Sequence, residues 1–294
     1  MLGRSRRSGD GFMQCACGRR HWGRFGAAGL LVQRGDELLL QHRAAWSHEG
    51  GTWAVPGGAL DVGETPLQGA LREAAEEAAV GEQSIRPRHA WAVDHGTWAY
   101  TTVVADAVGP ITPQRLDAES EELRWVRLGE VTRLPLHSGF AAAWPSVQPL
   151  LHRREVVVVD AANVVGSTPD GWWNDRVGAA QRLLDGVSDL AVRGLSTPAQ
   201  DPDAGLLPAV AGRTRAWPHW TVVLEGEASA AGDSPHVRVE RAPRSGDDAV
   251  VEAARHTSTA GRHVTVVTAD RELRQRVEAL GARTVGPRTL TRLF

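Results

Sequence analysis

The chain contains no lysine, so all 33 of its permanently cationic residues are arginines, and it has only two cysteines, Cys15 and Cys17. Two cysteines exclude a disulfide framework, and we therefore expect a reducing, cytoplasmic setting. The apolar runs are shorter than the roughly 20 residues that cross a bilayer, so we expect no membrane partner. The formal charge of -2 excludes a general attraction to polyanions. A polyanion would have to bind through a local basic patch or a metal.

Length and composition describe a soluble globular protein of two domains. The 294 residues are 42% hydrophobic and 23% charged, and each half is long enough to bury its own core. We expect a flexible N-terminal segment over residues 1–21, one domain over 22–151 and another over 155–294. His152, Arg153 and Arg154 form the predicted linker. The oligomeric state is left open.

Hydrophobic periodicity predicts a different kind of fold in each half. In the first half we expect strands over 27–32, 37–42, 89–93, 97–105 and 123–127 and helices over 66–79 and 140–151. This mixture is typical of an α+β or α/β sandwich. In the second half we expect strands over 155–159, 221–224, 237–240, 263–267 and 283–285 and helices over 176–192, 248–256 and 271–280. Such alternation predicts an α/β domain with a mainly parallel sheet. Residues 196–218, rich in Pro, Gly and Ala, indicate a mobile loop.

The helix expected from residue 66 begins with clear local signals. Thr65 suits the N-cap, Pro66 the first helical position, and Gln68 completes a capping box with Thr65. Apolar residues then recur at helical spacing and form one face, whose members are Leu67, Ala70, Leu71, Ala74 and Ala78.

Three carboxylates occupy a separate face of this helix. At about 100° per residue, Glu73, Glu76 and Glu77 fall together and repel one another. Hard divalent cations such as Mg²⁺ or Mn²⁺ prefer oxygen ligands and would relieve the repulsion. The alternative is a solvated acidic face.

The segment Gly58–Val80 resembles the Nudix box. That pattern is Gly, five residues, Glu, seven residues, Arg-Glu, an apolar residue, any residue, Glu-Glu, any residue, Gly and an apolar residue. All places but one are filled, by Gly58, Glu64, Arg72, Glu73, Ala74, Glu76, Glu77 and Val80. The resemblance covers about Trp22 to Leu151, and Ala79 stands where the family has Gly. Because Gly81 lies two residues on, we expect the helix to end later and the change to be local.

The resemblance implies an α/β/α sandwich with a mixed sheet and a Mg²⁺- or Mn²⁺-dependent pyrophosphohydrolase. Its substrate would be a nucleoside triphosphate or another nucleoside diphosphate derivative. It implies metal ligands at Glu73, Glu76, Glu77 and the Gly57 carbonyl, and catalytic roles for Glu73, Arg72 and Glu64. It places substrate contacts at Arg43, Trp53 and Gly58. Nudix enzymes often take a further carboxylate from a later loop, for which the candidates here are Asp117, Glu119, Glu121 and Glu122.

A second set of acidic residues follows apolar strands in the C-terminal half. Asp160 comes directly after Val156–Val159, and Asp270 comes shortly after Val264–Val267. Sites in open α/β sheets gather beyond the carboxyl ends of strands, so these carboxylates can converge. The alternative is that Asp270, and Asp247 or Asp248, are helix N-caps.

Together these residues resemble the NYN branch of the PIN-like nucleases. The matching positions are Asp160, Asn163, Asp247, Asp248, Thr268 and Asp270. The resemblance implies an endoribonuclease acting on single-stranded RNA, with Mg²⁺ or Mn²⁺ held by Asp160, Asp247, Asp248 and Asp270. Asp160 and Asp270 would be catalytic, and Asn163 would contact substrate. Further candidates are Asp175 for the acidic set and Trp172 and Trp173 for base stacking or the core. Arg213, Arg215, Arg241 and Arg244 are candidates for binding the RNA backbone, with simple solubility as the alternative.

Cys15, Cys17 and His21 look like half of a zinc site. A closed site would need a fourth ligand such as His42, His48 or an acid. The alternative is a pair of free thiols in a loose N-terminal segment.

Three functions remain open. The first is a Nudix pyrophosphohydrolase with an appended PIN-like domain that cleaves or binds RNA. In the second, RNA is the true substrate, and the Nudix half trims or senses a nucleotide or an RNA 5′ end. The third is a nucleotide sensor without turnover, for which Ala79 is the support.

Overall fold

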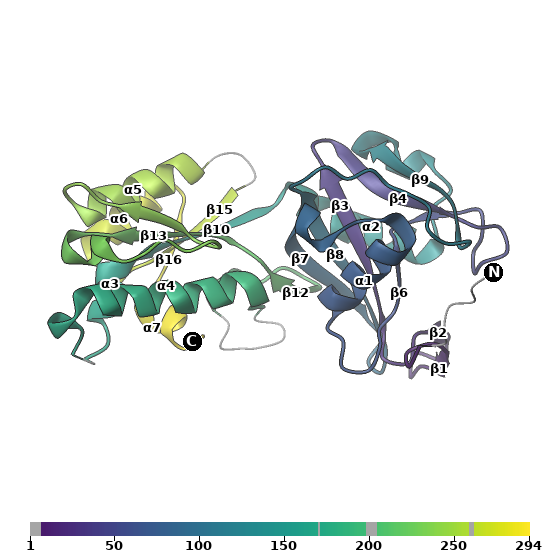
Figure 1. The fold of residues 1–294 in the computed structure, drawn as a ribbon, viewed down its shortest axis with the longest axis horizontal. Coiled ribbons are helices and arrows are strands. Elements are labelled where there is room, and N and C mark those ends of the chain that lie inside the picture. Colours follow the sequence, from purple (N-terminus) through teal and green to yellow (C-terminus); the bar gives the residue numbers. More distant parts are fainter. Residues whose placement is uncertain (1–6, 170, 198–204, 259–261) are drawn as a thin grey trace. The chain divides into compact units, whose positions relative to one another are not determined.

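The computed structural model describes residues 7–169, 171–197, 205–258 and 262–294 (Figure 1). The chain divides into two compact units. One ends at Leu151 and also takes in Gly212–Thr214, and the other comprises His152–Ala211 and Arg215–Phe294. Among the described residues, none of the helices has both the length and the apolar character that a bilayer crossing requires.

The first unit is built on a mixed sheet, as the sequence predicts. Its main strands are β3 (Ala27–Arg34), β4 (Glu37–Arg43), β5 (Trp53–Ala54), β6 (Gly57–Ala59), β7 (Ile85–Asp94), β8 (Ala99–Ala107) and β9 (Ser120–Arg127). Strand β3 runs parallel to β8 and antiparallel to β4 and β6. The pairs β7–β8, β4–β5 and β4–β9 are antiparallel. Residues 212–214 lie at the β7 edge, where Ala92 donates to the Gly212 carbonyl.

Helix α1 (Pro66–Ala78) packs on this sheet through small side chains. Ala70 and Ala74 share a buried cluster with Leu30 and Val32 of β3. Alanine has a short side chain, so the helix backbone lies close to the sheet. Glu73 and Glu77, on the neighbouring face of α1, are thereby carried into the interior beside β6. The 3-10 segments η1 (Glu82–Ser84) and η2 (Leu128–Arg133) and helix α2 (Ser138–His152) complete the unit.

A hairpin occupies much of the region where the sequence predicts a flexible segment. Strands β1 (Phe12–Gln14) and β2 (Arg20–Trp22) pair antiparallel. The rings of Phe12 and Trp22 meet edge to face, and the Trp98 indole donates to the Trp22 carbonyl at 3.1 Å. Local propensity does not reveal this hairpin, because a loop about 75 residues further along the chain helps to hold it. Residues 1–6 lie outside the described chain.

The second unit is an α/β domain whose five-stranded sheet is entirely parallel, which confirms the expected fold class. The strand order is β14-β13-β10-β15-β16. Its strands are β10 (Arg154–Asp160), β13 (His219–Leu224), β14 (Arg238–Arg241), β15 (Arg262–Val267) and β16 (Arg283–Val285). Its helices are α3 (Ala161–Gly166), α4 (Arg176–Arg193), α5 (Gly246–Thr257), α6 (Arg271–Glu278) and α7 (Pro287–Thr291), with η3 (Trp172–Asn174) and η4 (Gly226–Ala230).

Successive valines of β10 point to opposite faces of this sheet, and both faces are buried. Val157 and Val159 share a core with Leu184 of α4, whereas Val156 and Val158 share another with Val250 of α5. Helices therefore cover both faces, and the carboxyl ends of the strands remain the place where polar side chains gather.

The loop expected over residues 196–218 is partly wrong. Arg213–Ala216 forms strand β12, and Arg215 and Ala216 pair with the short strand β11 (Leu195–Ser196). Ala216 and Trp217 are buried, and burying these apolar side chains outweighs the turn-forming composition around them. Residues 198–204 of that loop lie outside the described chain.

Candidate active site

The start of α1 confirms the predicted capping box. The Thr65 hydroxyl accepts from the Gln68 amide at 3.3 Å, and the Gln68 side chain accepts from the Thr65 amide at 2.9 Å. Pro66 occupies the first turn. These local bonds set where the helix begins and hence the direction in which its glutamates point.

Arg72 ties the helix to the loop before it. Its guanidinium forms a two-point ion pair with Glu64, from Nε at 2.7 Å and from Nη2 at 2.8 Å. It also donates to the Ala59 carbonyl and to Glu73. Hydrogen bonding to Glu64 raises the pKa of Arg72, and the same bond lowers the pKa of Glu64. Both groups therefore stay charged over the whole physiological range.

Gly58 makes room for the Glu73 carboxylate. Glu73 is only 4% exposed. A Cβ added at Gly58 would lie 2.7 Å from Cδ of Glu73, which real side chains do not tolerate. Any side chain at this position would therefore push the Glu73 carboxylate out of its place beside strand β6.

Glu77 is the most deeply buried carboxylate of the helix, at 2% exposure. Its Oε2 accepts from the Gly57 amide at 3.0 Å and from Nε2 of Gln41 at 3.3 Å. Burial, followed by repulsion from Glu73 and Asp117, raises the pKa of Glu77 to about 8. Gln41 is a site residue that sequence reasoning misses, although a lone amide after Leu38–Leu40 in a buried strand is a usable signal.

Two of the four candidate carboxylates from the later loop, Asp117 and Glu119, reach Glu77. Carboxylate oxygens of Glu77, Asp117 and Glu119 lie within 4.8 Å of one another. The other two members do not join them, because Glu121 pairs with His42 at 3.3 Å and Glu122 with Arg124 at 3.7 Å. These three carboxylates, one of them the buried Glu77, supply hard oxygen donors that fit a divalent cation such as Mg²⁺ or Mn²⁺.

Glu76 lies at the more open side of α1 and is engaged by the N-terminal segment. The guanidinium of Arg7 forms an ion pair with Glu76 and another with Asp61 at 3.3 Å. Ser8 and the Gly9 amide also donate to Asp61. The sequence does not indicate these contacts, because the partners of Arg7 lie 54 and 69 positions further along the chain. The expectation that residues 1–21 are flexible therefore did not include them.

The helix ends at Ala78, so the expectation of a later end is wrong. Ala79 adopts the left-handed conformation with φ 56° and ψ 31°. Its amide still donates to the Ala74 carbonyl, as a C-terminal glycine would. The substitution therefore leaves the backbone geometry in place and adds a strained Cβ.

Arg43, the last residue of β4, and Trp53, the first residue of β5, are both predicted to touch substrate but differ in their surroundings. Arg43 is half-buried and donates from Nε to the His48 carbonyl at 3.1 Å. Trp53 is 5% exposed, with its ring stacked on His42 at 4.9 Å and covered by Arg124. Little of the indole remains for a ligand, because these neighbours cover it.

Comparison with known proteins identifies the first unit. The NUDIX domain matches residues 23–146. A putative 8-oxo-dGTP diphosphatase 3 from Mycobacterium tuberculosis is 50% identical over 150 residues, which cover 47% of this chain and 69% of that protein. The chain belongs to the Nudix family. Its Nudix domain contains the box residues whose geometry is described above.

Two further relatives match the same half of this Nudix protein. A nucleoside triphosphate pyrophosphatase/Nudix hydrolase fusion protein from Bifidobacterium longum is 46% identical over 146 residues, 47% of this chain but only 30% of that protein. The solved structure of a Nudix hydrolase from M. Smegmatis, RenU, is 46% identical with a TM-score of 0.44, covering 48% of this chain and 93% of that one.

In the second unit, Asp160 and Asn163 join the ends of two strands. Asp160 is 8% exposed and caps α3 by accepting from the Asn163 amide at 3.1 Å. Its other oxygen accepts from the Thr268 hydroxyl at 2.9 Å. The Asn163 side chain accepts from the Ala269 amide at 2.8 Å. The motif residues after β10 and β15 therefore meet, although they are more than 100 positions apart.

The other motif aspartates divide into different roles. Asp270 caps α6, as the simpler alternative predicts, by accepting from the Leu273 amide at 2.7 Å. Neither Asp247 nor Asp248 caps α5, so that part of the alternative is wrong. Ser245 is the cap, and Asp248 pairs with Arg276. Serine occupies the cap because its hydroxyl reaches the Asp248 amide.

Electrostatic repulsion links carboxylates at the strand ends. Burial, then repulsion from Asp247 and Glu225, raises the pKa of Asp160, although hydrogen bonds oppose the rise. Burial, then repulsion from Asp270, raises the pKa of Asp247. Glu225, which follows β13 and accepts from the Gly246 amide at 2.8 Å, is missed by sequence reasoning. Its signal is a carboxylate directly after the apolar run ending at Leu224.

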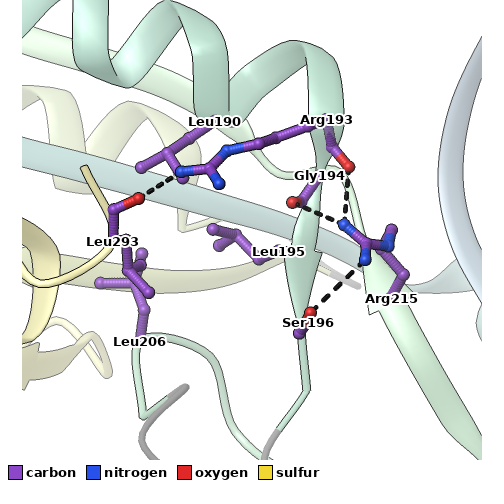
Figure 2. Close-up of a pocket in the computed structure, with 8 residues that line it drawn as sticks. All are labelled: Leu190, Arg193, Gly194, Leu195, Ser196, Leu206, Arg215 and Leu293. Atoms are coloured by element: carbon purple, nitrogen blue, oxygen red, sulfur yellow. Dashed lines mark hydrogen bonds between the residues drawn. The ribbon is translucent and has the colours of Figure 1, made fainter. Parts of the chain in front are cut away.

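The arginines expected to bind RNA do not form one surface. Arg213 is fully buried. Arg215 lines a pocket of the second unit, where it donates to the carbonyls of Arg193 and Gly194 (Figure 2). The backbone therefore engages its guanidinium. Arg241 pairs with Asp233 at 2.8 Å, and Arg244 is exposed.

The remaining candidates near η3 lie apart from the core. Asp175 caps α4 by accepting from the Gly178 amide at 2.8 Å. Trp173 is 55% exposed, so core packing does not account for it. Trp172 is half-buried and meets Trp173 edge to face, with Arg176 over its ring.

Proposed function

We propose that the first unit is a divalent-metal-dependent pyrophosphohydrolase acting on a nucleoside triphosphate or a related nucleoside diphosphate derivative. The observation that carries the proposal is the meeting of Glu77 with Asp117 and Glu119 beside the charged pair Arg72–Glu64. The diphosphatase relative from Mycobacterium tuberculosis makes 8-oxo-dGTP the first substrate to test.

The donor set suits a hard cation. Glu73, Glu76, Glu77 and the Gly57 carbonyl would hold Mg²⁺ or Mn²⁺, with Asp117 and Glu119 adding charge. The cation would neutralise the pyrophosphate and lower the pKa of a bound water. The raised pKa of the buried Glu77 fits this role, because a cation repays the cost of charging a buried carboxylate.

The chain's own groups would position and deprotonate the attacking water. Glu64 holds the guanidinium of Arg72, and Arg72 in turn donates to Oε1 of Glu73. This contact orients Glu73, whose other oxygen would accept the water proton. Gly58 leaves space for that carboxylate and for substrate contact. Arg43, at the end of β4, would bind the nucleotide.

The test is a substrate panel on the purified full chain with Mg²⁺ or Mn²⁺, read by chromatography of the products. The panel contains 8-oxo-dGTP, dGTP, other nucleoside triphosphates, dinucleotides, nucleotide sugars and capped RNA. Glu77→Gln should lose activity, while the exposed Glu82→Gln in the same unit should keep it. Full activity of Glu77→Gln would refute the proposal. Nucleotide binding without turnover across the panel would favour a sensor.

A metal-dependent ribonuclease activity of the second unit is the second candidate. The observation in its favour is that Asp160 and Asn163, at the end of β10, contact Thr268 and Ala269, after the end of β15. Asp160 and Asp247 would hold Mg²⁺ or Mn²⁺ against a phosphate, with Asp270 and Asp248 as further ligands and Asn163 near the substrate. In this case the Nudix unit would trim or sense a nucleotide or an RNA 5′ end.

Labelled single-stranded RNA incubated with Mn²⁺ tests the second candidate. Asp160→Asn and Asp247→Asn should abolish cleavage, and the exposed Asp189→Asn on α4 is the matched control. Asp247→Asn is tested alongside Asp160→Asn because Asp247 does not cap a helix, so its replacement should not unfold one. Absence of cleavage by the wild type, or equal cleavage by all variants, would reject the candidate.

A further inference from the structure

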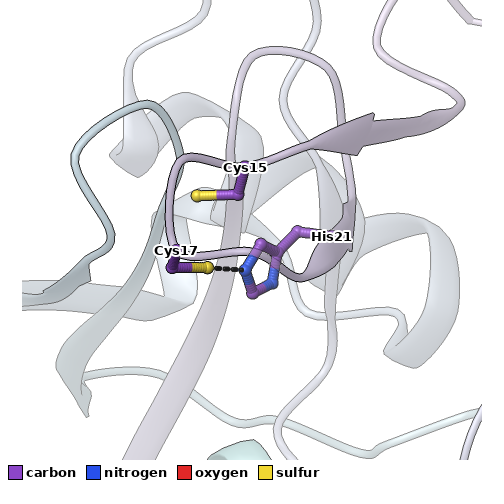
Figure 3. Close-up of side chains that lie close together, drawn as sticks. All are labelled: Cys15, Cys17 and His21. Atoms are coloured by element: carbon purple, nitrogen blue, oxygen red, sulfur yellow. Dashed lines mark hydrogen bonds between the residues drawn. The ribbon is translucent and has the colours of Figure 1, made fainter.

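The N-terminal hairpin brings two thiols and an imidazole together (Figure 3). Sulfur atoms of Cys15 and Cys17 and a ring nitrogen of His21 lie within 4.8 Å of one another. Cys17 Sγ and His21 Nε2 are 3.2 Å apart. Ligands around a tetrahedral zinc ion, with bonds of about 2.3 Å to sulfur and 2.0 Å to nitrogen, lie roughly 3.5–3.8 Å apart. The one measured pair is slightly closer than that spacing, and the other pairs are at most 4.8 Å apart.

The hairpin backbone holds the thiols in this arrangement. The Cys15 amide donates to the Arg19 carbonyl at 2.9 Å, and the Gly18 amide donates back to the Cys15 carbonyl at 3.0 Å. Gly18 has φ 84°, a conformation that favours glycine and lets the chain turn directly after Cys17. A turn closed on the first cysteine presents both sulfurs on the same side, as chelation requires.

A second imidazole stands next to these donors. The ring of His95, in the loop between β7 and β8, stacks on His21 with centroids 4.7 Å apart. Cys15 Sγ contacts the His95 carbonyl at 3.4 Å, and Thr97 Oγ1 donates to the same sulfur.

We propose that Cys15, Cys17, His21 and His95 form a structural zinc site that fastens the N-terminal hairpin to the β7–β8 loop. Sequence reasoning points to His42, His48 or an acid for the fourth ligand, whereas the fold stacks His95 on His21, from where its ring would turn toward the metal. Thiolate and imidazole ligands select Zn²⁺, while the carboxylates around Glu77 select Mg²⁺ or Mn²⁺. The unit would thus hold two chemically distinct metal sites.

Metal content of the full chain, purified under reductant without chelators, tests the site. We expect about one zinc per chain, and a cobalt-substituted protein with the intense visible bands of tetrahedral thiolate coordination. Cys17→Ser, at an exposed position, should lose the zinc and the bands. His95→Ala should weaken zinc binding by at least about tenfold. The exposed His236→Ala is the control and should bind as the wild type does.

Several outcomes would overturn the proposal. Wild-type protein with two reactive thiols and no zinc is one, and a Cys15–Cys17 disulfide seen as a mass loss of two hydrogens is another. Equal zinc content in Cys17→Ser and the wild type would indicate adventitious metal. Unchanged affinity in His95→Ala would overturn the four-ligand site. Circular dichroism on each variant separates loss of ligand from loss of fold.

Discussion

The Arg7 guanidinium pairs with Glu76, a glutamate of the Nudix box that the family resemblance makes a metal ligand. A cation supplied by the chain itself therefore contacts a carboxylate that a divalent ion would also use. Arg7 is held there by the contacts that Asp61 makes with Arg7, Ser8 and Gly9. The N-terminal segment thus bears directly on the candidate active site.

Arg7→Ala should lower the Mg²⁺ concentration needed for half-maximal hydrolysis. Both partners are about one-third exposed, so the pair is worth up to about 1 kcal/mol and the shift should be about two- to fivefold. A magnesium titration of the initial rate measures it. The exposed Arg127→Ala is the control, and an unchanged or higher magnesium requirement in Arg7→Ala would contradict the idea that Arg7 competes with metal.

Ala79→Gly should stabilise the first unit. Ala79 has φ 56°, where its Cβ is strained and glycine is not, so relief should contribute about 1 kcal/mol. Thermal or urea unfolding of the Nudix unit measures the change. Ala75→Gly, at an exposed position inside the same helix, should instead destabilise by about 1 kcal/mol. The same sign for both variants would show that the conformation of residue 79 is not decisive.

Glu77 should make the metal-free protein less stable as pH rises. Burial raises its pKa from 4.5 to about 8 in the folded state, so the folded protein retains a proton that the unfolded chain has lost. The contribution is fully present below pH 4.5, declines as pH rises toward 8, and is then constant. Melting temperatures with chelator over this window should fall more steeply for wild type than for Glu77→Gln.

Mg²⁺ supplies the complementary measurement. A bound cation favours the charged carboxylate, so added Mg²⁺ should raise the wild-type melting temperature most at pH 8 and have little effect in Glu77→Gln. Glu82→Gln should behave as wild type in both series. Parallel pH profiles for wild type and Glu77→Gln would mean that Glu77 does not titrate in this window.

Gly58→Ala should reduce catalysis strongly while the unit stays folded. The added methyl would lie 2.7 Å from the Glu73 carboxyl carbon and displace it. Misplacing a catalytic group by about 1 Å can cost on the order of 100-fold in rate. We expect a fall in kcat of at least about tenfold in steady-state kinetics. At Gly129 an added Cβ meets no neighbour, so Gly129→Ala should retain activity, and similar rates in the two variants would contradict the steric argument.

Local signals account for what the sequence predicts correctly. The helix from Pro66 rests on Thr65 and Gln68, which lie within three residues of each other, and on an apolar repeat of the same short range. The parallel sheet of the second unit likewise follows from apolar runs such as Val156–Val159. Departures occur where distant groups intervene, as at the N-terminal hairpin and at β12.

The sequence by itself determined the Nudix helix, its three glutamates and the α/β character of the second unit, because each depends on neighbours along the chain. Tertiary structure alone decided which further groups join them. Asp117 reaches Glu77 across 40 residues, Glu225 acts on Asp160 across 65, and His95 meets His21 across 74. Such contacts depend on strand order and loop paths, which residue spacing does not encode.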